Sequence, residues 1–323
     1  MKSNFKISGW GYYLPPKIET ALDISKKIGK TEKWIIENAG VSERRISDID
    51  VDSMGAMAAK DAIGEKEKPD LIINASGVPK QTIPDTSVFI QKELGYDGIP
   101  SFSIHSTCLS FLSGLNIAGS LIKNDQYNRI LLVSSDRGSR GRNFDEPESA
   151  ALLGDAAAAV LVEPSTKNEK SELISFRMQT WPEGSHLTEV RGGGTNLHPQ
   201  DQNTTLDDNL FSMNGPLIYK MARKKVYEVI KNDINENNLT PADIDCLVPH
   251  QASILAIKAY SKYGGFNENK VINIINKTGN CVAASLPLAF SIACEKKKIK
   301  RDNLVYLVGT GAGLSIASIL LRY

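Results

Sequence analysis

The chain has 323 residues, 41% of them hydrophobic, and is long enough to bury a large core. Its formal net charge of +1 gives no bulk attraction to nucleic acid or to anionic membranes. No stretch approaches the roughly 18 consecutive apolar residues of a membrane helix, and residues 1–10 lack the apolar centre of a signal peptide. We therefore expect a soluble cytoplasmic protein with neither nucleic acid nor membrane as partner.

Short β-branched runs alternate with longer helical patterns along the first half of the chain. A buried strand is expected over 71–74 and a helix over 87–94. A second helix is expected to open at Cys108 and to run to residue 123, and a strand over 130–134 follows it. This alternation indicates an α/β fold.

The second half repeats the same order of elements. A strand led by an aspartate covers 245–249, a helix follows Asn280, and a further strand covers 303–308. Matching elements are offset by about 175 residues, which predicts an internal duplication. The polar, turn-rich segment 163–170 is the expected junction. The predicted halves are 1–165, which carries the cysteine nucleophile, and 166–323, which carries the histidine and asparagine described below.

One cysteine lies where an apolar run changes into a helical pattern. At a helix N-terminus, backbone N–H groups and the positive end of the helix dipole would lower the pKa of the Cys108 thiol and favour a thiolate. Such a thiolate accepts acyl groups well, and a buried structural cysteine is the alternative. The other cysteines (Cys246, Cys281 and Cys294) lack the spacing of a disulfide framework.

Two further residues extend this candidate site. His250, in Pro-His-Gln-Ala, ends a buried strand, and α/β enzymes place reactive groups at strand ends. Asn280 opens a helix among small residues, and a helix N-cap is its structural alternative. No group of histidine, cysteine or carboxylate residues has the spacing of metal ligands, so no metal is expected.

Taken together, the three motifs have the order and approximate spacing of one known family. The chain resembles the 3-oxoacyl-ACP synthase III (ketoacyl synthase III) family of the thiolase superfamily from end to end. Further segments that match the family pattern are 9–15, Glu32–Ile35, Gly40–Arg45, Gly154–Asp155, Met213–Gly215 and Gly309–Gly313.

The resemblance implies a five-layered αβαβα thiolase fold and a homodimer. It implies that Cys108 takes an acyl group from acyl-CoA or acyl carrier protein, while the backbone N–H groups of Cys108 and Ala312 hold the oxyanion. His250 and Asn280 would then bind the thioester carbonyl of a malonyl or β-ketoacyl unit. Loss of CO₂ from that unit gives the carbanion that attacks the acyl group, and no cofactor is required.

Departures from the family pattern lie around substrate recognition. Leu109 is bulkier than the usual residue after the cysteine and should reshape the acyl pocket. Trp34 matches a tryptophan that stacks on the CoA adenine, but Pro147 falls near the position of the arginine on its other side. Leu255 stands where a basic residue usually faces the carrier protein, and Lys258 or Lys262 would compensate. The expected substrate-binding residues are Trp34, Ile83, Leu109, Asn214 and Ser253.

These departures are typical of family members that have moved from fatty acid biosynthesis to polyketide or other secondary metabolism. One alternative is an acyltransferase that moves the acyl group from Cys108 to an oxygen or nitrogen nucleophile, with His250 as general base. A non-catalytic partner subunit is a further alternative, against which the retained cysteine argues. Ile83 stands where head-to-head condensing relatives present a glutamate, which disfavours acyl-to-acyl condensation.

Overall fold

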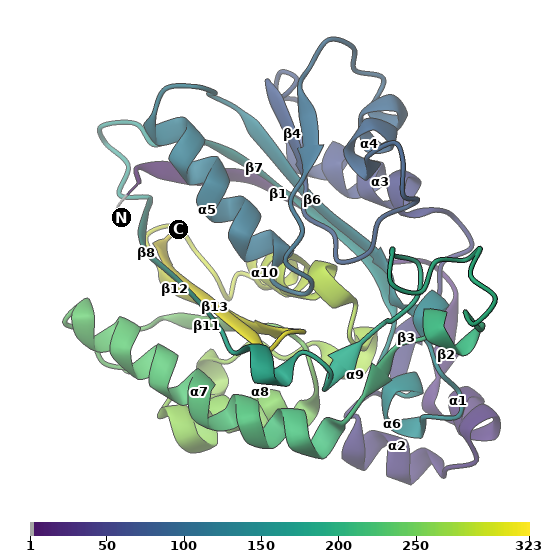
Figure 1. The fold of residues 1–323 in the computed structure, drawn as a ribbon. Coiled ribbons are helices and arrows are strands. Elements are labelled where there is room, and N and C mark those ends of the chain that lie inside the picture. The colour runs from purple at the N-terminus through teal and green to yellow at the C-terminus, as the bar shows by residue number, and fades with distance from the viewer. Residues whose placement is uncertain (1–2) are drawn as a thin grey trace.

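The computed structural model describes residues 3–323, which form two main β-sheets flanked and separated by helices (Figure 1). The first sheet contains β1 (Phe5–Tyr13), β4 (Leu71–Asn74), β5 (Ser101–Ser103), β6 (Ile130–Arg137) and β7 (Asp155–Pro164). Their order across the sheet is β1-β7-β6-β4-β5. β7 pairs with β1 and β6 in antiparallel fashion, whereas β4 pairs with β6 and β5 in parallel.

The second sheet contains β8 (Glu172–Thr180), β11 (Cys246–Pro249), β12 (Leu304–Gly311) and β13 (Ser315–Arg322). Their order is β11-β12-β13-β8, with β11 and β12 parallel and the other pairs antiparallel. β4 and β11 are buried along their whole length, as expected for parallel strands covered on both faces.

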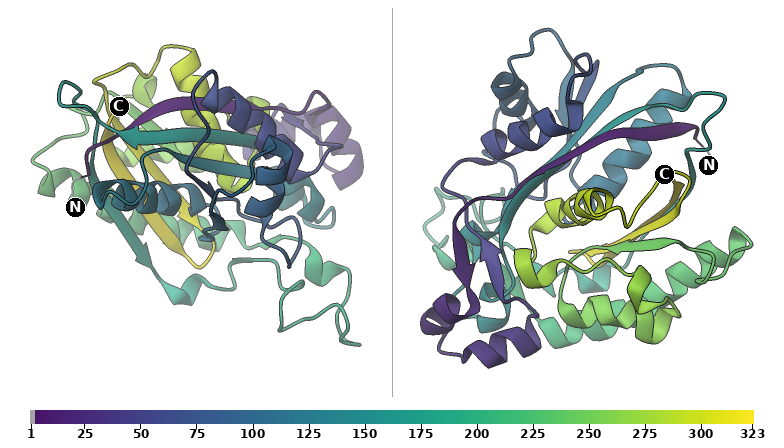
Figure 2. Two further views of the ribbon diagram at one scale, coloured as in Figure 1. Left: turned by 90° about the horizontal axis from the view of Figure 1, so that it is seen from above. Right: turned by 180° about the vertical axis from the view of Figure 1, so that it is seen from behind.

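Three layers of helices enclose the two sheets. α3 (Val51–Ile63) and α4 (Thr86–Leu94) cover the outer face of the first sheet, and α7 (Gly215–Glu236) and α8 (Ile254–Gly264) cover the second. Between the sheets lie α5 (Ser110–Lys123) and α10 (Ser285–Glu295), as the view from behind also shows (Figure 2). The predicted αβαβα arrangement is confirmed.

The remaining elements are short and gather mainly beside the start of α7 (Figure 1). They link the layers and border the site described below. They are α1 (Ala21–Ile28), α2 (Glu32–Asn38), α6 (Pro147–Ala150), α9 (Ile275–Thr278), the strand pairs β2 (Ile18–Thr20) with β3 (Glu43–Arg45) and β9 (Thr188–Glu189) with β10 (Ser212–Met213), and 3₁₀ turns at Gly138–Gly141, Pro182–Gly184, Asp207–Asn209, Glu268–Lys270 and Val282–Ala284.

The central helices are buried because their sequences are apolar or small on nearly every side. Every residue of α10 from Ser285 to Cys294 is buried, and a helix without a polar face is stable only inside the protein. α5 buries residues 110–115 in the same layer. The two helices and the inner faces of both sheets share one continuous core.

The strand order repeats between the two halves of the chain. β1-β7-β6-β4 corresponds to β8-β13-β12-β11, with the same pairing directions. Equivalent backbone bonds also recur, since Ala75 N–H donates to Val133 O at 2.6 Å and His250 N–H donates to Val308 O at 2.8 Å. We propose that residues 1–165 and 166–323 are the two products of a duplication, with the junction between β7 and β8.

One predicted boundary was wrong. α5 begins at Ser110, with Leu109 as its N-cap, rather than at Cys108. The cause is a tight turn closed by the bond from Leu109 N–H to Ser106 O, which takes up residues 106–109 and so leaves Cys108 before the helix.

Several structural properties bear on the class of protein. Within residues 3–323, no helix is long and apolar enough to cross a membrane. The same residues contain no group of three histidine, cysteine or carboxylate side chains that could hold a metal ion. The four cysteines are free thiols.

Candidate active site

Cys108 lies on a tight turn between β5 and α5. Leu109 N–H donates to Ser106 O at 3.0 Å, which closes the turn. Ser110 Oγ accepts from Ser106 N–H at 2.9 Å and donates to Thr107 O at 2.7 Å. Thr107 has a φ of +52°, a conformation that costs a β-branched residue about 1 kcal/mol or more and that is retained mainly where function requires it. The turn therefore fixes Cys108 just before the helix.

The surroundings of Cys108 do not favour a thiolate in the substrate-free protein. Burial, with a smaller effect from the carboxylate of Asp136, raises the pKa of the Cys108 thiol to about 12. The sequence-based expectation of a lowered pKa is therefore wrong. The loss of hydration raises the pKa of Cys108 more than the helix N-terminus lowers it. The helix effect is weak because α5 begins two residues further on, and the negative charge of Asp136 also raises the pKa.

His250 follows directly on β11, and the rest of its motif holds it in place. Its N–H donates to Val308 O of β12. The buried Gln251 side chain donates to Pro249 O at 2.8 Å and accepts from Ile274 N–H at 2.9 Å, which fixes the chain on both sides of the histidine. His250 is 3% exposed, and burial lowers its pKa to about 4. The imidazole is thus neutral at pH 7, and its Nδ1 has no hydrogen-bond partner within residues 3–323.

Asn280 lies on the equivalent turn before α10. Its Oδ1 accepts from Val282 N–H at 2.9 Å and from Ser285 Oγ at 3.3 Å, while its Nδ2 is 3.5 Å from Ala252 O. The N-cap of α10 is Ala284, so Asn280 is not the helix cap that the sequence offered as an alternative. Because Oδ1 is engaged and Nδ2 has one long contact, the amide N–H group is the part that remains available to a ligand.

Two glycines of β12 bring the Cys108 turn and His250 together. A Cβ atom placed on Gly309 would lie 3.0 Å from both His250 Cβ and Leu109 Cδ2. On Gly311 it would lie 2.5 Å from Thr107 Oγ1. Only glycine allows this approach, so the turn and the histidine pack on the same strand. Ala312 follows Gly311 directly and therefore lies next to the Cys108 turn.

A cavity of about 460 Å³ opens from His250 towards the surface. It lies between α2, α7 and α8, and its lining includes Trp34 and Ser253, two of the residues expected to bind substrate. Its volume is in the range of sites for small molecules and cofactors.

The other three residues expected to bind substrate have different surroundings. Leu109 is fully buried in the core against β12, whereas Ile83 is 80% exposed on the loop before α4. Asn214 caps α7, since its Oδ1 accepts from Leu217 N–H at 3.2 Å. The structure therefore brings Trp34 and Ser253 to the cavity but leaves Leu109, Ile83 and Asn214 outside its lining.

A buried carboxylate beside the site was not identified from the sequence. Asp136, at the end of β6, accepts from the N–H groups of Gly77 at 2.9 Å, Val78 at 3.0 Å and Ala284 at 3.1 Å. Burial raises its pKa to about 7. Asp136 thus joins the two halves directly behind the turns of Cys108 and Asn280. The sequence feature that could have identified Asp136 is the polar run Ser134–Asp136, which ends an otherwise apolar strand.

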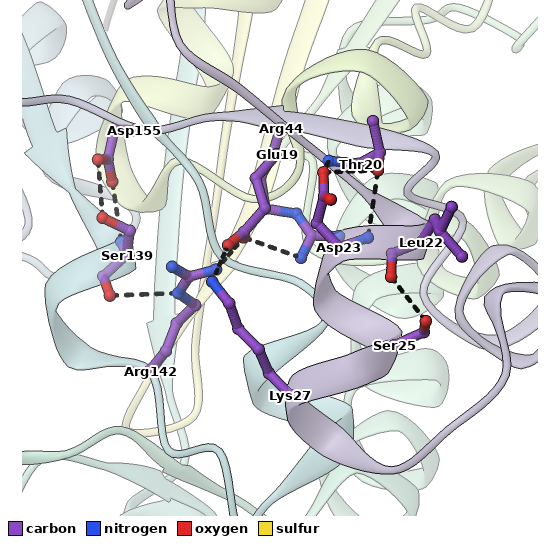
Figure 3. Close-up of polar contacts among 10 residues, drawn as sticks. All are labelled: Glu19, Thr20, Leu22, Asp23, Ser25, Lys27, Arg44, Ser139, Arg142 and Asp155. Carbon is purple, nitrogen blue, oxygen red and sulfur yellow. Dashed lines mark hydrogen bonds and ion pairs between the residues drawn. The ribbon is translucent and has the colours of Figure 1, made fainter.

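A buried ion cluster supports the Asn280 segment (Figure 3). Glu19 contacts Arg142, Lys27 and Arg44. Arg44 is fully buried, and burial lowers its pKa to about 10. Its Cβ would lie 3.2 Å from a Cβ on Gly154, whose N–H donates to Asn280 O. The motif that contains Arg44 therefore acts here as a support behind the site.

Comparison with known proteins gives consistent results. Two models of one family match the chain: 3-oxoacyl-[acyl-carrier-protein (ACP)] synthase III over residues 102–182 and its C-terminal part over residues 234–323. β-Ketoacyl-[acyl-carrier-protein] synthase III of Aquifex aeolicus is 32% identical, covering 98% of this chain and 99% of its own. The enzyme of the same name from Wolbachia pipientis is 34% identical over the full length of both chains.

A solved structure shows the same fold. 3-Oxoacyl-(acyl carrier protein) synthase III from Pseudomonas aeruginosa superposes with a TM-score of 0.92 at 25% identity, over 99% of this chain and 98% of that one. The similarity therefore extends over both halves rather than over a single motif.

Proposed function

Because the chain belongs to the 3-oxoacyl-[acyl-carrier-protein] synthase III family, we propose that Cys108 carries the acyl group in a condensation with a malonyl or β-ketoacyl thioester. The chain is a condensing enzyme of the ketoacyl synthase III type and an acyltransferase. The assignment of residues rests on one observation above all, the convergence of the Cys108 turn and His250 on the glycines of β12.

In the first half-reaction, Cys108 Sγ attacks the carbonyl carbon of an acyl thioester, and its proton passes to the sulfur of the departing carrier. The resulting oxyanion accepts hydrogen bonds from the backbone N–H groups of Cys108 and Ala312. Collapse of this intermediate breaks the original C–S bond. The carrier leaves as a thiol after it takes up the proton, and the acyl group stays on Cys108.

In the second half-reaction, the thioester carbonyl of the malonyl or β-ketoacyl unit binds between His250 Nε2 and Asn280 Nδ2. Both groups donate hydrogen bonds that strengthen as CO₂ leaves and negative charge moves onto the carbonyl oxygen. The carbanion then attacks the acyl carbon on Cys108. A carbon–carbon bond forms, the bond to Sγ breaks, and the enzyme thiol is restored.

The state of His250 favours condensation over acyl transfer to an oxygen or nitrogen nucleophile. A general base works best when its pKa is near the working pH, and burial lowers the pKa of His250 to about 4. A neutral imidazole of this kind is a weak base, yet it still donates a hydrogen bond. This matches the role of stabilising an enolate.

The proposal is tested by intact mass spectrometry with a panel of acyl-CoA and acyl-carrier thioesters. We expect one acyl adduct that disappears in Cys108→Ala and persists in Cys294→Ala, the matched control with a different buried cysteine replaced. With a malonyl thioester present, the adduct should be consumed as CO₂ is released and a β-keto product appears.

Two results would contradict parts of the proposal. If none of the thioesters gives an adduct, Cys108 is not the acyl acceptor. If the adduct is consumed by an alcohol or amine while no malonyl donor is used, the enzyme transfers acyl groups without condensation. Detection of a carbon–carbon product excludes the second case as the main activity.

We further propose a homodimer formed through the β5 edge of the first sheet. Among residues 3–323, no strand pairs with the outer side of β5, and Phe102, Val78 and Ile83 expose 38%, 54% and 80% of their surfaces nearby. Ser103 Oγ donates to Asp85 at 2.9 Å, which keeps these segments together. Light scattering should give twice the chain mass for the wild type and a lower mass for Ile83→Asp. A monomeric wild type would refute this interface.

A further inference from the structure

The buried ion cluster around Glu19 contains more positive than negative charge. Glu19 on β2 and Arg44 on β3 lie directly opposite each other in the two-stranded pair, and each is the buried residue of its strand. Arg142, just after the 3₁₀ turn Gly138–Gly141, and Lys27 of α1 complete the cluster (Figure 3). Three cations therefore share one carboxylate.

Two of these cations already occupy Glu19. Its Oε1 accepts from Lys27 Nζ at 2.5 Å, and its Oε2 accepts from Arg142 Nη1. Arg44 Nη1 lies 3.8 Å from the same Oε2, which is too far for a hydrogen bond. Glu19 thus attracts Arg44 electrostatically but accepts no hydrogen bond from it.

The guanidinium group of Arg44 is buried without a hydrogen-bond partner. Its side chain is 0% exposed, and Nε, Nη1 and Nη2 all lack a partner among residues 3–323. Burial lowers the pKa of Arg44 to about 10, an effect that Glu19 opposes and the positive charge of Arg142 reinforces. The group still carries its charge at pH 7. Because an unpaired buried charge is strongly destabilising, a ligand that pairs with Arg44 is favoured.

Other carboxylates of this region are engaged elsewhere. Glu43 pairs with Lys277 at 3.4 Å, and Asp155 accepts from Ser139 N–H at 2.8 Å. Asp23 lies at the start of α1, where it accepts bonds that cap its own helix. Within the part of the chain that the structure describes, the side chains therefore leave this cluster with an excess of positive charge.

We propose that the cluster binds a small inorganic anion, chloride or an ion of similar size, which accepts hydrogen bonds from Arg44 and balances the charge of Arg44 and Arg142. A monatomic ion suits the site because protein encloses the Arg44 side chain. Lys27 is 48% exposed, so the cluster reaches the surface there and offers the ion a path. Water accepts the same hydrogen bonds but carries no charge, and it is the alternative that the experiment must exclude.

An anion at Arg44 would also act on the segment that positions Asn280. Arg44 Cβ lies 3.2 and 3.5 Å from the positions that Cβ atoms would take on Gly154 and Gly279. Gly154 N–H donates to Asn280 O at 3.0 Å, and Asn280 N–H donates to Leu152 O at 2.8 Å. An ion that fixes Arg44 therefore stabilises these two backbone bonds. The inference goes beyond the proposed function, and its test needs no enzymatic activity.

The experiment compares thermal unfolding in sodium chloride and in sodium gluconate at equal ionic strength, because gluconate is too large to enter the cluster. A ligand that binds only the folded state raises Tm by mass action. We expect Tm to rise along a saturating curve with chloride, by about 2 to 5 °C at saturation, and to stay constant with gluconate. Bromide should act as chloride does.

Four variants assign the effect to this cluster. Arg44→Met should reduce the chloride-specific rise to less than about 1 °C, and Arg142→Gln should do the same and decides the point if the first variant does not fold. Glu19→Gln removes the carboxylate, so the rise should become at least about twofold larger. Arg129→Gln is the matched control, since this guanidinium already has two carboxylate partners, and it should keep the wild-type rise.

Two further measurements locate the ion. In crystals soaked in bromide, an anomalous peak should lie against the Arg44 guanidinium. Hydrogen exchange of the peptide 276–284, which contains Asn280, should slow in chloride but not in gluconate.

Three results would overturn the inference. Equal Tm values in chloride and gluconate would mean that water alone occupies the cluster. A chloride effect that Arg142→Gln leaves unchanged, or a bromide peak elsewhere with none at Arg44, would assign the ion to another site. None of these measurements depends on acylation of Cys108, so this inference and the proposed function fail independently.

Discussion

The raised pKa of Cys108 makes a quantitative prediction about its reactivity. With a pKa of about 12, the thiolate fraction at pH 7 is about 10⁻⁵, whereas a free cysteine of pKa near 8.5 has about 3% thiolate. The thiolate is thus roughly 3,000-fold scarcer. A thiolate of higher pKa is also the stronger nucleophile, and this raises the reaction rate of each thiolate by a factor of roughly 40. In the absence of substrate, Cys108 should react with iodoacetamide about a hundredfold more slowly than free cysteine at pH 7.

The pH dependence separates this effect from simple inaccessibility. Steric burial slows the reaction equally at all pH values, whereas a raised pKa makes the rate increase about tenfold per pH unit from 7 to 10 without a plateau. The rate is followed by intact mass, and Cys108→Ala reports the reaction of the other three cysteines. A plateau below pH 8, or a rate equal to that of free cysteine at pH 7, would show a thiolate paired with an imidazolium and refute the reasoning.

Three further predictions concern the framework of the site. Gly311→Ala places a Cβ 2.5 Å from Thr107 Oγ1 and should cost about 1 to 3 kcal/mol in urea unfolding while slowing Cys108 acylation at least tenfold. Asn280→Ala should leave acylation by a thioester within about twofold but lower CO₂ release from a malonyl donor at least a hundredfold, because the lost donor acts on the enolate. Asp136→Asn replaces one acceptor oxygen by an N–H₂ group that faces N–H donors and should destabilise the fold by about 2 to 4 kcal/mol. Unchanged unfolding of Asp136→Asn, or equal loss of both half-reactions in Asn280→Ala, would contradict these expectations.

The pH dependence of stability follows from the same buried groups. The pKa of His250 is lowered to about 4 in the folded state, so its neutral form contributes stability that is present above the unfolded pKa near 6.5. This contribution is lost as the pH falls towards 4 and amounts to about 3 kcal/mol, at 1.36 kcal/mol per pKa unit.

The strands followed from local sequence and the order of the layers from the family resemblance, whereas the electrostatics of the site followed from neither. Apolar runs such as 71–74 and 246–249 are long enough to identify buried strands without knowledge of their neighbours. The pKa of Cys108 depends on burial between two sheets and on Asp136, and both come from distant parts of the chain. The cavity at His250 is likewise formed by residues from distant segments, so no single motif could predict it.

The motifs could be recognised in the sequence, but some of their residues have roles in the structure that differ from the expected ones. Asn214 matched a family segment beside the site, yet its side chain caps α7. Arg44 matched as well, and it supports the Asn280 segment from behind. A motif fixes the residue type, but only packing decides whether the side chain points into a cavity or into the framework.

The internal repeat offers independent support for the proposed oxyanion hole. With the offset of about 175 residues, Thr107 corresponds to Val282, and both have a φ of +52°. Cys108 then corresponds to Ala283, and Ser110 Oγ and Ser285 Oγ close the two turns through equivalent bonds to the backbone.

In the second half, this turn already binds an anionic oxygen. The backbone N–H groups of Ala283 and Ala284 donate to the carboxylate of Asp136, and the bond from Ala284 is 3.1 Å long. Gly311 of the second half corresponds to Asp136 and lies against the Cys108 turn of the first half, so the carboxylate of Asp136 has no counterpart at that turn. The turn that holds a carboxylate in one half therefore has no such side-chain acceptor in the other half, where the proposed mechanism uses its N–H group to hold the oxyanion formed at Cys108.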